Sequence, residues 1–185
     1  MINTTFFRIA LFISFLISLT GCLTNAVRPL AQGGTASADT SVIVYGVRLE
    51  TAWSSPNMMF SVDAYDTDKQ AVKGNCWHLD KAEALVSGTP STTRYFAFEV
   101  PAGHYVFGAW SVTALQIPER VFYAGKGETV YLGNFIYNRD KQIVIQRDLD
   151  SAKPEILAAL PKTPATIALA QAQRAGRVAL FLCTP

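Results

Sequence analysis

Short apolar runs separated by turn residues limit what this chain can fold into more than any other feature of its sequence. The runs are rich in Val, Ile, Phe and Tyr, and Gly, Pro, Asn and Asp lie between them. This arrangement is typical of antiparallel β structure. We expect strands at Val42–Leu49, Met58–Tyr65, Arg94–Val100, Tyr105–Val112, Arg120–Tyr123, Thr129–Tyr137 and Gln142–Arg147.

The second of these segments shows the clearest alternation. Within it, Phe60, Val62 and Ala64 alternate with Ser61, Asp63 and Tyr65. A period of two places the two sets on opposite faces of a strand. We therefore expect the first set to lie in the core and the second set to face solvent.

Three turns are expected to join consecutive strands as hairpins. In Val100–Tyr105, Pro101 fixes φ for a first turn position and Gly103 accepts the left-handed conformation that follows a type I turn. Gly125–Glu128 and Asn138–Lys141 have similar turn chemistry. Together these turns predict a meander of about five consecutive strands.

The apolar strand, the Pro-x-Gly-x-Tyr turn and the strand that follows resemble hairpins of transthyretin-like, or prealbumin-like, β-sandwiches. The later run Ala124–Gly133 is similar to a segment of uncharacterised bacterial lipoproteins predicted to have such folds. The resemblance covers approximately residues 94 to 147. It implies an antiparallel β-sandwich of transthyretin-like or Ig-like type, and it implies no catalytic residues.

The pattern changes after the last predicted strand. Ser151–Glu155 is typical of a helix start and predicts a helix that ends near Leu160. The Ala-rich segment Thr166–Ala175 predicts a second short helix, and Arg177–Cys183 returns to strand character and is expected to pair with the first strand. Residues 41–185 are thus expected to form one mainly β domain with one or two short helices near its C-terminus.

Residues 1–21 have the pattern of an export signal. Arg8 provides a basic start, and Ile9–Leu19 form an apolar run that is shorter than the roughly 20 residues of a spanning helix. The sequence Leu19-Thr20-Gly21-Cys22 resembles the bacterial lipobox. The resemblance implies cleavage before Cys22 and a diacylglycerol on its sulfur. The alternatives are an ordinary signal peptide or an uncleaved anchor.

Lipidation of Cys22 would make the protein peripheral, because two or three acyl chains, at about 0.8 kcal/mol per buried methylene, hold it firmly at a membrane. Residues 22–40 are small and polar, and we expect a flexible tether with a reach of roughly 25 Å. The residue after the cysteine is Leu23, unlike the aspartate that resembles an inner-membrane retention signal. This implies the outer membrane, with the domain facing the periplasm, or the outer face of a single membrane.

Charge predicts no macromolecular partner. The formal net charge is +2 at pH 7, and one positive unit belongs to Arg8 in the leader. A nucleic-acid-binding protein would carry a basic stripe or patch, and none is visible.

Two cysteines remain once Cys22 is lipidated. In an oxidising compartment, Cys76 and Cys183 are expected to form a disulfide. It would close a loop of about 100 residues and contribute up to about 4 to 5 kcal/mol. The alternative is a pair of buried thiols.

Motifs for catalysis or metal binding are absent from the sequence. His78 and His104 have no ligand at a metal-binding interval, and Asp63, Asp66 and Asp68 lack the rest of a calcium loop. No nucleophile elbow or phosphate loop occurs. We therefore expect a non-enzyme with no cofactor, although a pair of glycosidase carboxylates would leave no motif.

The aromatic residues provide the remaining candidates for a binding surface. Trp53 lies in the polar stretch Thr51–Asn57 and is expected to be exposed. Together with Trp77 and His78 it is a candidate to contact a protein or to stack on a sugar. Two function classes follow: an accessory or protein-interaction module of the cell envelope, and a module that binds a glycan or another small envelope ligand. We prefer the first because no pocket motif is visible.

Overall fold

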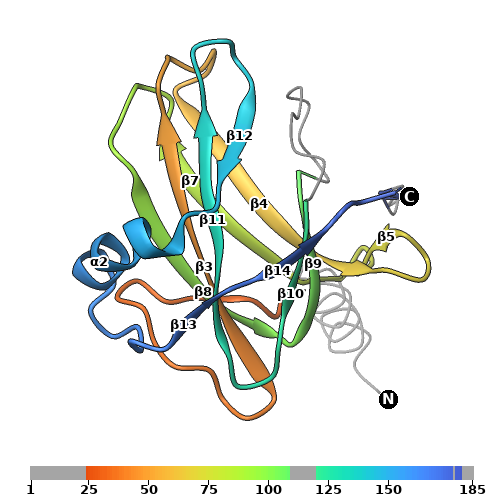
Figure 1. Cartoon of the computed structure of the whole chain (residues 1–185). Coiled ribbons are helices and arrows are strands. Elements are labelled where there is room, and N and C mark those ends of the chain that lie inside the picture. The colour runs from red at the N-terminus through yellow and green to blue at the C-terminus, as the bar shows by residue number, and fades with distance from the viewer. Residues whose placement is uncertain (1–23, 109–119, 177, 181–185) are drawn as a thin grey trace, which may run out of the picture.

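Two sheets of six strands each make up most of the molecule (Figure 1). The computed structural model describes residues 24–108, 120–176 and 178–180. In the first sheet the strand order is β12-β11-β3-β8-β2, and β13 also pairs with β11. Its strands are β2 (Arg28–Pro29), β3 (Thr40–Leu49), β8 (Arg94–Pro101), β11 (Thr129–Tyr137), β12 (Ile143–Gln146) and β13 (Ile167–Leu169).

The second sheet has the order β14-β10-β9-β4-β5, and β7 also pairs with β4. Its strands are β4 (Asn57–Asp66), β5 (Ala71–Val72), β7 (Lys81–Ser87), β9 (Gly103–Phe107), β10 (Val121–Ala124) and β14 (Gln171–Gln173). A separate parallel pair joins β1 (Thr24–Asn25) to β6 (His78–Leu79). The molecule is therefore mainly β, and each of the seven strands predicted between Val42 and Arg147 coincides at least in part with an observed one.

The sheets face each other across a shared aromatic core. Phe135 of β11 stacks on Phe107 of β9 with their ring centroids 4.1 Å apart, and Tyr45 of β3 meets Phe135 edge-on at 5.6 Å. The alternation predicted for β4 is confirmed on this face, because Phe60 and Val62 are fully buried.

The opposite face of β4 does not lie in solvent as expected. Ser61, Asp63 and Tyr65 are all buried. Tyr65 packs with Val106, Val121 and the partly buried Ala175 and Val178. The expectation was wrong because the C-terminal segment covers part of this face, and that covering cannot be read from the strand itself.

Helix α2 (Leu149–Ala159) confirms the first predicted helix and begins two residues before Ser151. Asp148 caps it by accepting a hydrogen bond of 3.1 Å from the backbone N–H of Ser151. The buried side chains of Ala152, Ile156 and Leu160 pack on the outer face of the first sheet.

Two of the three predicted hairpins are wrong. Strands β8 and β9 belong to different sheets, and so do β10 and β11, so the turns at Val100–Tyr105 and Gly125–Glu128 lead the chain from one sheet to the other. The turn at Asn138–Lys141 is a hairpin, as predicted, with Tyr137 opposite Ile143. A tight turn has the same residues whether the next strand pairs beside the last one or crosses to the facing sheet.

The second predicted helix is also wrong. The segment Thr166–Ala175 contains β13, which runs parallel to β11, and β14, which runs antiparallel to β10. It passes from the first sheet to the second, as the dark blue ribbon in Figure 1 shows. The exposed edges of β11 and β10 offer backbone hydrogen bonds that outweigh the helix propensity of alanine.

Residues 24–40, expected to be a flexible tether, are paired with the body of the molecule. The N–H of Leu30 donates to the carbonyl of Ala97 at 2.8 Å, and Val27 is buried. The carboxylate of Glu99 accepts hydrogen bonds from Ser37 and Thr40, at 2.9 and 2.8 Å, and from Arg28. These contacts fasten the segment to β8.

Several predictions concern residues outside the described ranges. They are the leader at residues 1–21, Cys22, Cys183 and the later part of the segment Tyr105–Val112. Within the terminal segment, Ala179 bridges to Ala71 of β5. Because β8 and β11 occupy both edges of β3, the predicted pairing of the terminal segment with the first strand is wrong.

Candidate functional site

Strand β7 forms an edge of the second sheet. Ala82, Ala84 and Val86 are buried and alternate with exposed residues, which is the pattern of a half-buried strand. Within the described residues β7 pairs with β4 alone. On its other edge the side chain of Asn25 bonds both backbone groups of Lys81, at 2.8 and 3.1 Å, so this edge is open to a partner strand only beyond Lys81. The strand was missed in the sequence because Ala, Lys and Glu have low β propensity, although its period of two was visible.

Met59 and Leu85 form an apolar pair on the outer face at this edge. They lie directly opposite each other on β4 and β7, and they are 51% and 58% exposed. The ammonium of Lys81 lies 3.9 Å from the sulfur of Met59 and 2.6 Å from a carboxylate oxygen of Glu83. An exposed apolar pair bordered by charges, next to an open strand edge, is suited to contact with another protein.

Trp77 protrudes from the turn that leads into β6. The side-chain oxygen of Asn75 accepts hydrogen bonds from the backbone N–H groups of Trp77 and His78 at 2.8 and 2.9 Å. This Asx turn holds the backbone of Trp77, whose side chain is 64% exposed. The indole is thus presented on a fixed backbone.

His78 lies between a hydroxyl and a carboxylate. Its Nδ1 is 3.1 Å from Oγ1 of Thr24, and its Nε2 is 3.3 Å from a carboxylate oxygen of Asp80. Thr24 also donates its hydroxyl hydrogen to the carbonyl of Trp77 at 2.9 Å. These contacts hold β1 against β6.

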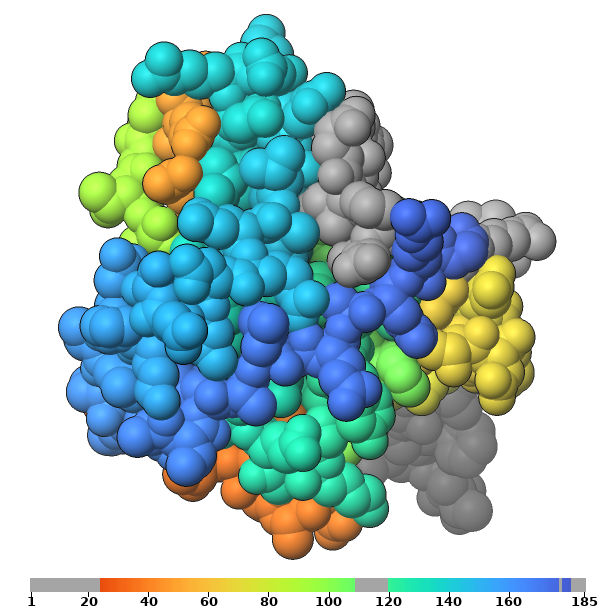
Figure 2. Space-filling model, viewed as in Figure 1, coloured from red at the N-terminus to blue at the C-terminus, as the bar shows by residue number. Residues whose placement is uncertain are grey.

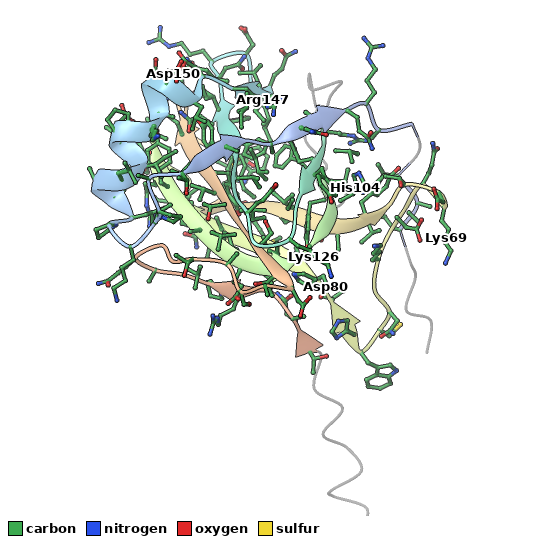
Figure 3. The ribbon with its side chains drawn as sticks, turned by 60° about the horizontal axis from the view of Figure 1, so that its bottom comes forward. Lys69, Asp80, His104, Lys126, Arg147 and Asp150 are labelled. Atoms are coloured by element: carbon green, nitrogen blue, oxygen red, sulfur yellow. The ribbon has the colours of Figure 1, made fainter. Side chains whose placement is uncertain are left out.

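Trp53 lies far from the other two predicted binding residues. It is half-buried, its ring meets Tyr137 edge-on at 5.1 Å, and its N–H donates to the carbonyl of Gly88 beyond the end of β7. His78 precedes the start of the same strand, so the length of β7, roughly 20 Å at about 3.3 Å per residue, separates them. Figure 3 labels Asp80, whose carboxylate lies 3.3 Å from the imidazole of His78. The structure therefore brings Trp77 and His78 together but leaves Trp53 apart.

The acidic residues considered for a calcium loop do not converge. Asp63 is buried beside Ser61, whereas Asp66 accepts hydrogen bonds from the backbone N–H groups of Asp68 and Lys69. These bonds, that of Lys69 first, lower the pKa of Asp66 from its ordinary value. No group of three His, Cys, Asp or Glu residues in the described part of the chain is placed to hold a metal ion.

Tyr131, which is buried, and Tyr95, which is partly buried, lie on the outer face of the first sheet beside α2. The hydroxyl of Tyr95 donates to the carboxylate of Glu155 at 2.9 Å. Burial, together with this carboxylate, raises the pKa of Tyr95 to about 12, and burial also raises the pKa of Tyr131. Both phenols are protonated at neutral pH, and that of Tyr95 fastens the helix to the sheet.

Cys76 is disulfide-bonded. The other cysteines of the chain, Cys22 and Cys183, lie outside the described residues. Residues near both ends of the described chain pair with the region around Cys76: Thr24 pairs with His78, and Ala179 bridges to Ala71. The partner of Cys76 stays a prediction.

No helix within the described ranges has the length and apolar character needed to cross a bilayer. His104, the remaining histidine, is half-buried with its ring 5.0 Å from that of Tyr123.

Comparisons of the chain with protein-family models, curated proteins and solved structures found no match.

Proposed function

We propose that this chain is a non-enzymatic lipoprotein of the cell envelope that binds another envelope protein through the edge formed by β7. The observation that carries the proposal is the exposed pair Met59 and Leu85 beside an open strand edge. The partner segment that fits this surface is an extended one with apolar side chains on one face.

The backbone of β7 supplies the means of binding. A partner strand added to an open edge gains main-chain hydrogen bonds, and alternate side chains provide specificity. Leu85 would meet one face of the added strand, with Met59 beside it. Glu83 and Lys81 border the pair and set the charge that a partner must match.

The anchor and the location belong to the same proposal. The lipobox residues Leu19–Cys22 support lipidation at Cys22, and Leu23 supports outer-membrane sorting with the domain facing the periplasm. Two facing sheets joined by tight turns support a sandwich of transthyretin-like or Ig-like type.

The test is cross-linking in native cells followed by affinity purification of the lipidated protein and of two variants. Leu85→Glu places a charge in the proposed contact and should remove the dominant partner. Leu169→Glu is the control, because Leu169 is 42% exposed on β13 of the other sheet. Equal recovery of the partner with both variants would contradict the proposed surface, and no envelope partner for the unchanged protein would contradict the function.

A glycan or small envelope ligand is the second candidate, and the exposed indole of Trp77 beside His78 favours it. Sugar rings stack on such exposed aromatic faces. Titration of the protein with envelope glycans should then quench tryptophan fluorescence to saturation, and the response should disappear in Trp77→Ala but persist in Trp53→Phe.

A further inference from the structure

A cleft lies at the end of the molecule where β3 finishes. Its volume is about 470 Å³. Three segments form it: the end of β3, the loop after β7, and the hairpin between β11 and β12. They contribute Arg48, Leu49, Glu50, Pro90, Ser91 and Arg139. In Figure 2 these segments, coloured orange, yellow-green and cyan, lie side by side at the upper left of the molecule.

Arg48 is held in place by the strand that carries it. It alternates with the buried Val47 and Leu49 and therefore projects from the outer face of β3. Its terminal Nη2 donates to a carboxylate oxygen of Glu50 at 2.7 Å, while its Nε is buried without a hydrogen-bond partner. Because the buried Nε is out of reach of a ligand, the guanidinium offers the cleft its remaining terminal N–H groups.

Arg139 lies in the turn of the hairpin between β11 and β12, and hydrogen bonds hold the backbone of this turn. The N–H of Asn138 donates to the carbonyl of Gln142 at 2.9 Å, and the side chain of Asn138 accepts from the N–H of Gln142 at 3.0 Å. Arg139 itself is exposed and, among the described residues, forms no ion pair or hydrogen bond. The turn therefore fixes the backbone at Arg139, and the exposed guanidinium has all its donors available.

The net charge of the cleft favours an anion. Two guanidinium groups and one carboxylate, that of Glu50, line it, so one positive charge is in excess. Guanidinium groups match the geometry of carboxylates and phosphates, and the hydroxyl of Ser91 adds another donor. The cleft is shallow and open to solvent, so a small anionic group can reach it directly.

We infer that this cleft binds a small molecule through an anionic oxygen group, a carboxylate or a phosphate, held between Arg48 and Arg139. Ser91 orients the group, and Pro90 provides an apolar wall. The inference is independent of the proposed protein contact, which uses Met59 and Leu85.

The test is calorimetric titration of the full mature protein with inorganic phosphate, glucuronate and neutral glucose. Saturable binding of phosphate or of glucuronate, with none of glucose, supports the inference and identifies the anion. Replacing Arg139 by Gln should weaken this binding about tenfold or more, because charge-assisted hydrogen bonds are lost. Arg139 is exposed, so this variant should keep the thermal transition of the unchanged protein.

Arg174→Gln is the matched control. Arg174 is exposed and lies outside the cleft, and its replacement by Gln removes the same positive charge. Equal weakening by both variants would show general charge attraction and overturn the inference. Equal binding of glucose and glucuronate, or no binding of either anion at millimolar concentration, would overturn it as well.

Discussion

Replacing Phe135 by alanine should destabilise the molecule more than any surface change, because this ring joins the two sheets. It is fully buried and contacts Tyr45 of its own sheet and Phe60, Phe107 and Phe122 of the facing sheet, with centroid distances from 4.1 to 6.5 Å. Loss of a buried phenylalanine side chain costs about 3 to 5 kcal/mol, which combines lost transfer free energy with the cavity left behind. A domain of this size has a free energy of unfolding of only about 5 to 15 kcal/mol.

Urea denaturation, followed by tryptophan fluorescence, measures this cost. With an m-value of about 2 kcal/mol per molar, the midpoint should fall by roughly 1.5 to 2.5 M. Tyr123→Ala is the control, since Tyr123 is 41% exposed on β10 and should change the midpoint only slightly. A loss below about 1 kcal/mol for Phe135→Ala, with an unchanged m-value, would refute the argument that the sheets pack through this ring.

Three further predictions concern the ends of the chain. Peptide mapping without reduction should link Cys76 to Cys183; a Cys22–Cys76 peptide would contradict both this pairing and lipidation at Cys22. Replacing Cys22 by alanine should abolish palmitate labelling and release the protein from membranes. Continued membrane retention of this variant would contradict the lipoprotein proposal. Hydrogen bonds from Thr40 and Ser37, with the nearby Arg28, lower the pKa of Glu99 below its ordinary 4.5. The stability that these contacts add is therefore fully present above pH 4.5, and it is lost as the pH falls through the lowered pKa of Glu99. The protection of the amides of residues 28–40, measured as their exchange rates relative to the intrinsic rates at the same pH, should fall across this acidic range, and Glu99→Gln should remove this change in protection.

Strand positions were the most predictable part of the fold. Strand β11 has the predicted bounds Thr129–Tyr137, and β3, β4, β8 and β12 differ from prediction by at most two residues at either end. These strands combine β-branched and aromatic residues with clear turn residues at their ends, so local chemistry decides them. Strand β7 was not predicted because alanine, lysine and glutamate, which have low β propensity, make up most of it.

The candidate site was predictable only in part. The exposure predicted for Trp53 was wrong, because its ring packs on Tyr137. The candidates Trp77 and His78 are exposed and lie together in the turn and strand that precede β7. The pair Met59 and Leu85 was not predictable, because it joins a predicted strand to one that was missed. Arg48 and Arg139 lie far apart in the chain and meet only through the pairing of β3 with β11.

The sequence by itself determined which segments are extended, where the chain turns and where α2 begins, because these properties depend on neighbours a few residues away. Only the tertiary structure decided which sheet each strand joins. The turns at Val100–Tyr105 and Gly125–Glu128 cross between sheets, and the alanine-rich segment Thr166–Ala175 forms strands. In each case the choice depends on backbone edges and a facing core that distant parts of the chain supply.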